Sequence, residues 1–144
     1  MKRLLIAAAL LLPFSAIAAE GDPHSFGTYW TVTGVDTKPG HFVDYLEDLK
    51  QYYRKSLDMQ VKDGKVKSYT MFANVHNRDG EPDLYLLVEW TSGAEMLDTP
   101  TDYFDGLSAK LFGSLDNADT ANIDRGQLRT IMSTSLLREM SFTK

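Results

Sequence analysis

The segment "DLYLLVEW" (Asp83–Trp90) predicts a β-strand whose two faces both need cover. Its aromatic, β-branched and leucine side chains, without glycine or proline, are typical of strands. Successive side chains of a strand point to opposite faces. One face therefore carries Leu84, Leu86, Val88 and Trp90, and the other carries Tyr85, Leu87 and Glu89. Neither face suits water, so we expect other parts of the protein on both sides.

Three more strands are predicted from their content of β-branched and aromatic residues. They cover Gly27–Asp36, Lys65–His76 and Arg129–Phe142. The polar connection of residues 77–82 joins the second of them to Asp83–Trp90, which predicts a β-hairpin with a longer loop.

Two helical regions separate these strands. After Pro39, apolar residues recur at helical spacing from Phe42 to Leu57. A second helical region begins with the capping-box spacing of Ser92 and Glu95, breaks near Pro100 and continues to about Leu115. Residues 116–127 are polar, and we expect a loop with a helical turn there.

The order β-α-β-β-α-β predicts an α+β protein with a ferredoxin-like fold. In this fold four strands form one antiparallel sheet, and both helices lie on the same face. The second face would stay bare in a monomer. Face-to-face packing of two sheets in a homodimer would cover it. The alternative is a monomer that covers this face with its own N-terminal leader and residues 116–127.

The first residues of the chain have the three parts of a secretory signal peptide. Lys2 and Arg3 precede the apolar run Leu4–Leu12, and small residues allow cleavage after Ala18 or Ala19. The run is shorter than the roughly 20 residues that span a bilayer. We therefore expect a cleaved signal (1–19), a polar leader (20–27) and a single domain (28–144). The mature protein would be periplasmic or secreted, without membrane attachment.

The charge and the cysteine content of the chain exclude several classes of function. Cleavage would remove Lys2 and Arg3 and leave 13 basic against 20 acidic residues, a net charge of −7. Nucleic acid and anionic membrane surfaces are poor partners for such a chain. The 144 residues include no cysteine, which excludes disulfides, thiol nucleophiles and iron–sulfur clusters.

Three polar residues are candidates for catalysis. His41 lies in the expected first turn of a helix, where a neutral imidazole is favoured. His76 lies at the expected end of a strand, and Glu89 lies within the most apolar strand. The alternative for both histidines is an exposed surface position. The alternative for Glu89 is a salt bridge at an edge or at the rim of a dimer.

Five further residues are candidates for contacting a ligand in a flat aromatic pocket between the sheet and the helices. Aromatic residues in such positions also serve as plain core. The candidates are Trp30, Tyr69, Asn74, Trp90 and Tyr103.

No spacing typical of a metal site, a nucleophile elbow or a phosphate-binding loop is present in the sequence. We therefore expect neither a bound metal nor a phosphate-binding loop.

Several motifs resemble those of the dimeric α/β-barrel superfamily. Within it, the chain most resembles proteins that are similar to antibiotic-biosynthesis monooxygenases. The motifs are "TKPG" before the first helix, "DGKVKSYTMF" at the second strand and "EPDLYLLVEW" at the third. The resemblance covers residues 28–142. It implies a homodimer and a host for varied chemistry, including cofactor-free oxidation of quinols and haem degradation. The haem-degrading branch carries a histidine on a helix, and the second helical region here has none. We therefore expect no haem and no other cofactor.

Two functions from different classes remain open. The leading one is an exported protein that binds a small aromatic or quinone-like molecule or, as a monooxygenase-like enzyme, acts on it. The alternative is a non-catalytic interaction or stress-associated dimer without a small-molecule substrate. A pocket between sheet and helices favours the first, and a filled interior favours the second.

Overall fold

The computed structural model describes residues 21–143. Four strands form one antiparallel sheet: β1 (His24–Thr37), β2 (Val66–Ala73), β3 (Leu84–Trp90) and β4 (Arg129–Phe142). Their order across the sheet is β2-β3-β1-β4, so β3 is an interior strand. The predicted α+β class and the four-stranded antiparallel sheet are confirmed. The expected signal peptide (1–19) lies outside the described residues.

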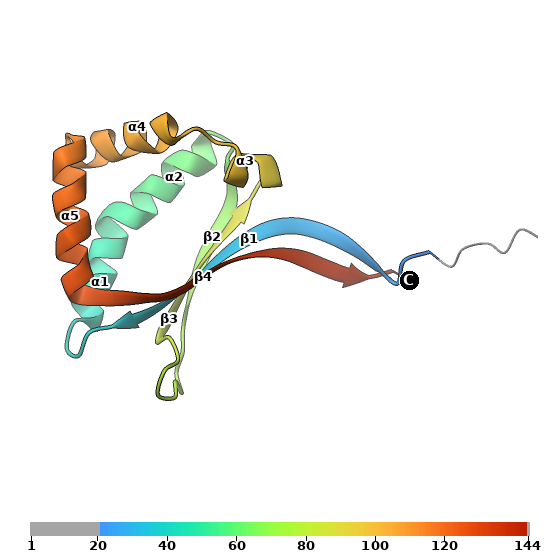
Figure 1. Ribbon diagram of the computed structural model, residues 1–144, viewed down its shortest axis with the longest axis horizontal. Coiled ribbons are helices and arrows are strands. Elements are labelled where there is room, and N and C mark those ends of the chain that lie inside the picture. The colour runs from blue at the N-terminus through green and yellow to red at the C-terminus, as the bar shows by residue number, and fades with distance from the viewer. Residues whose placement is uncertain (1–20, 144) are drawn as a thin grey trace, which may run out of the picture.

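The helices gather on one face of the sheet (Figure 1). After β1 comes one continuous helical stretch composed of α1 (Phe42–Asp48), the π-helix η1 (Leu49–Tyr53) and α2 (Arg54–Lys62). After β3 come three separate helices, which are α3 (Gly93–Leu97), α4 (Thr101–Phe112) and α5 (Leu115–Leu128). Among residues 21–143, no helix combines the length and apolarity needed to cross a bilayer.

One face of β3 forms the core against the helices. Leu84, Leu86, Val88 and Trp90 are all buried there, as the alternation of the sequence predicted. They belong to two apolar clusters, one built with Tyr45 and Leu49 and the other with Leu57 and Val66.

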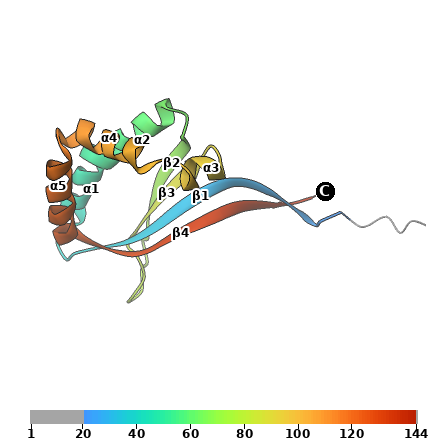
Figure 2. The ribbon, with the colours of Figure 1, turned by 45° about the horizontal axis from the view of Figure 1, so that its top comes forward.

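The other face of the sheet, here called the outer face, carries no helix formed by residues 21–143 (Figure 2). The strand register places Val32 beside Leu87 on it, with Phe72 beside Tyr85 at one side. Leu137 lies on the same face, opposite Trp30. Phe72 and Leu137 are 56% and 51% exposed in the single chain. The outer face therefore carries partly exposed apolar side chains beside polar ones such as Ser68 and Glu89.

Residues 116–127 lie within helix α5, so the prediction of a loop with a helical turn there is wrong. The reason is that α5 has almost no apolar stripe: its one buried residue is Ala118. A helix cap and an ion pair stabilise α5 instead. Gly113 ends α4 with a positive φ of 83°, and the Ser114 hydroxyl accepts a hydrogen bond from the Asn117 N–H. An ion pair between Arg125 and Asp48 ties α5 to α1.

This correction also removes most of the cover that a monomer could offer. Helix α5 packs on α1 and α4, on the helix side of the sheet, and leaves the outer face open. The leader expected at residues 20–27 is partly strand, because β1 begins at His24 and pairs with β4 up to Phe142.

Other boundaries differ by a few residues. Strand β2 ends at Ala73, so His76 lies in the connection and not at a strand end. Ser92 caps α3 by accepting a hydrogen bond from the Glu95 N–H, as the capping-box spacing predicted. The predicted break near Pro100 is also present, since α4 starts at Thr101.

We expect Leu84→Ala to destabilise the protein by about 2–5 kcal/mol, because it removes buried methyl groups and leaves a cavity in the core. Leu84 is 3% exposed. Chemical denaturation monitored by circular dichroism measures the change. The matched control is Leu97→Ala at a site that is 65% exposed, where the loss should stay below about 0.5 kcal/mol. Equal losses in the two variants would contradict this description of the core.

Candidate functional site

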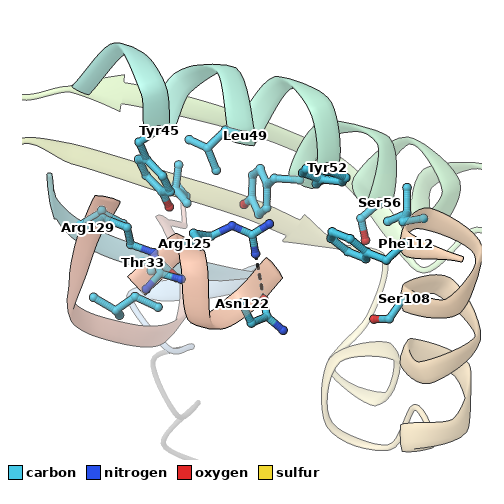
Figure 3. A pocket seen from close by; sticks show the side chains of 15 residues that line it. Thr33, Tyr45, Leu49, Tyr52, Ser56, Ser108, Phe112, Asn122, Arg125 and Arg129 are labelled. Atoms are coloured by element: carbon cyan, nitrogen blue, oxygen red, sulfur yellow. Dashed lines mark hydrogen bonds between the residues drawn. The ribbon is translucent and has the colours of Figure 1, made fainter. Parts of the chain in front are cut away.

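A cavity of about 310 Å³ lies between the helices and the helix side of the sheet (Figure 3). Its walls come from β1, β3 and β4 below, from the first helical stretch above, and from α4 and α5 at the sides. Fifteen residues line it: Thr33, Val35, Tyr45, Leu49, Tyr52, Tyr53, Ser56, Leu86, Ser108, Leu111, Phe112, Asn122, Arg125, Arg129 and Ile131. Asn122 is exposed, which places it at the mouth of the cavity.

The π-helix η1 supplies much of the cavity wall. Leu49, Tyr52 and Tyr53 all belong to this five-residue segment and all line the cavity. A π-helical turn inserts an extra residue and changes the direction of the side chains that follow, and such turns are frequent at functional sites. Here it lets a single helix present two successive aromatic residues toward the same space.

Aromatic and hydroxyl groups form the side nearest α4. The rings of Tyr52 and Phe112 stack with centroids 4.4 Å apart and an interplanar angle of 21°. Ser56 on α2 and Ser108 on α4 add hydroxyl groups to the lining (Figure 3). The side is therefore flat and mainly apolar, with a few polar atoms.

Two arginines line the opposite side. Arg125 on α5 makes two hydrogen bonds to the Asp48 carboxylate, from Nε at 2.5 Å and from Nη2 at 3.2 Å. Its Nη1 donates to the Asn122 side-chain oxygen at 2.9 Å. The side chains of Arg125 and Asp48 are only 15% and 16% exposed. This pair is thus a mostly desolvated, charge-balanced contact between α1 and α5.

Arg129 differs from Arg125 in its partners. It is the first residue of β4, and its guanidinium carbon lies 5.9 Å from the ring centroid of Tyr45. Its Nε atom is buried and has no hydrogen-bond partner among residues 21–143. Nor does Arg129 form a salt bridge with any side chain in that range.

The buried tyrosines of the cavity remain protonated at neutral pH. Burial raises the pKa of the Tyr45 hydroxyl, and the positive charge of Arg129 and its side-chain hydrogen bond to Tyr45 oppose this shift only in part. Burial also raises the pKa of Tyr53 well above its ordinary value, with smaller contributions from Tyr45 and Tyr69. Both hydroxyls therefore serve as hydrogen-bond donors or acceptors and not as bases.

Glu89, a candidate for catalysis, lies on the outer face, on the opposite side of the sheet from the cavity. Its carboxylate accepts hydrogen bonds from Lys67 Nζ at 2.7 Å, Ser68 Oγ at 2.7 Å and Thr28 Oγ1 at 2.9 Å. The hydrogen bonds from Lys67 and Ser68 lower the pKa of Glu89, and partial burial opposes them. Such a carboxylate stays ionised, in keeping with the salt-bridge alternative and not with a base in the cavity.

The two candidate histidines lie apart from Glu89 and from the cavity lining. His41 takes the N-cap position of α1 without capping it, and its Nδ1 lies 3.0 Å from an Asp44 carboxylate oxygen. His76 is exposed in the connection between β2 and β3. The structure thus does not bring the three candidates for catalysis together.

The five candidates for ligand contact are likewise absent from the cavity lining. Trp30 lies on the outer face. Trp90 is buried in the core, and its indole N–H donates to the Thr31 hydroxyl at 2.7 Å. Tyr69 and Tyr103 donate to Asp58 and Asp63, and Asn74 donates to a backbone carbonyl, that of Pro82.

Sequence reasoning missed most residues that line the cavity. Tyr45, Leu49, Tyr52 and Tyr53 were expected only as the apolar stripe of a helix. Arg125 lies in a segment expected to be a loop. The capping signal at Gly113 and Ser114 could have revealed α5 and, with it, the position of that arginine.

Comparison of the chain with protein-family models, with curated proteins and with solved structures finds no match. Within residues 21–143, no group of three or more metal-ligating side chains could hold a metal ion. The chemistry of the site therefore has to be argued from the cavity itself.

We expect Glu89→Gln to lower the melting temperature by a few degrees at pH 7. The carboxylate has a lowered pKa in the folded state, so its contribution is present above the unfolded value near 4.5. It is lost as the pH falls through the folded pKa, and the two melting curves should converge in acid. Differential scanning calorimetry from pH 3 to pH 8 measures the difference.

The matched control for this measurement is Glu47→Gln, because the Glu47 side chain is 69% exposed and its nearest cation lies 3.6 Å away. It should change the melting temperature little at any pH. If Glu89→Gln were more stable than the wild type at pH 7, Glu89 would be a desolvated acid and not a paired one.

Proposed function

We propose that this protein is an exported, homodimeric, ferredoxin-like small-molecule-binding protein. It takes a small aromatic or quinone-like compound in the cavity between the sheet and the helices. The observation that carries the proposal is the cavity of about 310 Å³ lined by Tyr45, Tyr52 and Phe112. The proposal of export rests on the N-terminal sequence.

The character of the cavity supports a ligand. Binding sites for small molecules are concave, mainly apolar and furnished with a few placed polar groups, from about 300 Å³ upward. This cavity is at the lower end of that range, which suits a compound with one ring. A dimer that served only as an interaction module would have no need for such a space, and a filled core would stabilise it better.

Binding is supported better than catalysis. The lining contains no histidine and no carboxylate, and its two buried tyrosines have raised pKa values. General acid–base chemistry at neutral pH needs a group whose pKa lies near the working pH. A cofactor-independent monooxygenase reaction is therefore the weaker form of the proposal.

The homodimer is supported by the open outer face. Contiguous exposed apolar surface on a sheet is uncommon in soluble monomers and marks interaction sites. Packing the outer faces of two copies would cover Val32, Leu87, Phe72 and Leu137 and produce a two-sheet barrel. The chain order and the sheet order β2-β3-β1-β4 support the ferredoxin-like topology on which this assembly depends.

We expect light scattering to give about twice the mass of one mature chain at micromolar concentration. Leu137→Lys should yield a folded monomer, because Leu137 is half exposed in the single chain and tolerates a charge there but not inside an interface. The matched control Leu97→Lys, at an exposed site on α3, should leave the dimer intact. A wild-type protein that stays monomeric would refute the dimer.

We expect native mass spectrometry and ligand-observed NMR with a panel of one-ring aromatics and hydroquinones to detect binding. Ser108→Phe should weaken it at least about ten-fold, because the new ring occupies the cavity. The control Asp105→Phe changes an exposed residue of the same helix and should leave binding unchanged. Equal weakening by both variants, or no binding by the wild type, would contradict the proposed site.

A further inference from the structure

The geometry points to a more specific ligand, an aromatic carboxylate whose anionic group binds Arg129. This inference rests on the proposed function, because it assigns a charge to the ligand of the same cavity. It is carried by the juxtaposition of a guanidinium that has no carboxylate partner among residues 21–143 with flat aromatic walls.

The balance of charge in the cavity is the first step. The lining contains two permanently charged groups, Arg125 and Arg129, and both are cations. Asp48 pairs with Arg125 through two hydrogen bonds and compensates that charge. Arg129 has no such carboxylate among residues 21–143, so the cavity carries a net charge of about one positive unit.

The hydrogen-bonding state of Arg129 is the second step. A buried donor without a partner costs free energy, and native proteins rarely keep one without a reason. The Nε atom of Arg129 is such a donor, and its side chain lines the cavity. Because Nε is itself closed to solvent, a ligand would meet the guanidinium where the Arg129 side chain lines the cavity, and a carboxylate there would compensate its charge. The planar guanidinium fork suits a planar carboxylate.

The aromatic walls of the cavity indicate the part of the ligand that lies beyond its carboxylate. Figure 3 shows Arg129 near Tyr45, with Tyr52 and Phe112 across the cavity. A ring that packs against Tyr52 and Phe112 could thus direct a carboxylate toward Arg129. The hydroxyls of Ser56 and Ser108 lie at the far side, where a second polar substituent of the ring would find a partner.

A structural role is the competing explanation for Arg129, and an experiment has to distinguish it from ligand binding. Arg129 is the C-cap residue of α5, and a cation is favoured at the negative end of a helix. If that interaction alone explains the residue, Arg129 stabilises the protein and has no preference among ligands. Stability and ligand preference therefore need separate measurements.

We propose a titration of the purified protein at pH 7 with two probes of equal shape, 4-hydroxybenzoate and 4-hydroxybenzamide. Isothermal titration calorimetry should show the acid binding at least about ten-fold more tightly than the amide. Arg129→Gln should abolish this preference, and Arg129→Lys should retain part of it. The matched control Arg138→Gln, an exposed arginine on the same strand, should keep the preference in full.

A measurement on the wild type keeps the inference testable if Arg129→Gln fails to fold. Adding the acid should shift the Arg129 Nε–H resonance in a ¹⁵N–¹H spectrum, and adding the amide should shift it much less. Arg138 again supplies the control signal, which should not move with either probe.

The outcomes separate this inference from the function on which it rests. Equal affinity for acid and amide, with both lost in Ser108→Phe, would overturn the carboxylate and leave the aromatic site in place. An unchanged acid preference in Arg129→Gln would also overturn the role of Arg129. Absence of binding for both probes and for the neutral aromatics would overturn both proposals.

Discussion

Strand β3 carries apolar side chains on both of its faces, and much of the architecture depends on how each face is shielded from water. It is an interior strand between β2 and β1, so its backbone hydrogen bonds are satisfied within the sheet. One face is buried against the helices and carries Leu84, Leu86, Val88 and Trp90. Its other face meets only the neighbouring side chains of the sheet, and the single chain offers no layer beyond them in residues 21–143. The proposed homodimer rests on this asymmetry.

Glu89 shows how a charge is accommodated within that apolar strand. Its residue is only 8% exposed, yet three donors from the two neighbouring strands surround the carboxylate. An ion pair with a side chain as exposed as Lys67 contributes modestly in water. Inside a dimer the same network would be desolvated, and its full satisfaction would then matter more. Glu89 is thus best understood as a structural residue of the outer face.

The cavity on the opposite side exists because the helices do not fill the space above the sheet. A π-helical segment in the first helical stretch directs Tyr52 and Tyr53 toward it, and one side is lined by Arg125 of α5 and by Arg129, the first residue of β4. Within the described residues, a carboxylate neutralises Arg125 and none neutralises Arg129. That difference gives the site its chemical character, and it depends on a single carboxylate, that of Asp48 on α1.

The sequence alone determined the four strands, the interior face of β3 and the capped helix at Ser92, because these depend on local alternation, spacing and capping. It did not determine α5, whose polar surface carries no periodic apolar signal and whose stability comes from a cap and from a contact with Asp48. The sequence also could not place the site: the eight candidate residues were chosen by residue type, and none lines the cavity. Which side of a sheet a side chain occupies, and which charges find partners there, depend on register and packing between distant segments. Only the tertiary structure could decide that Glu89 has a cationic partner and that Arg129 has no carboxylate partner among residues 21–143.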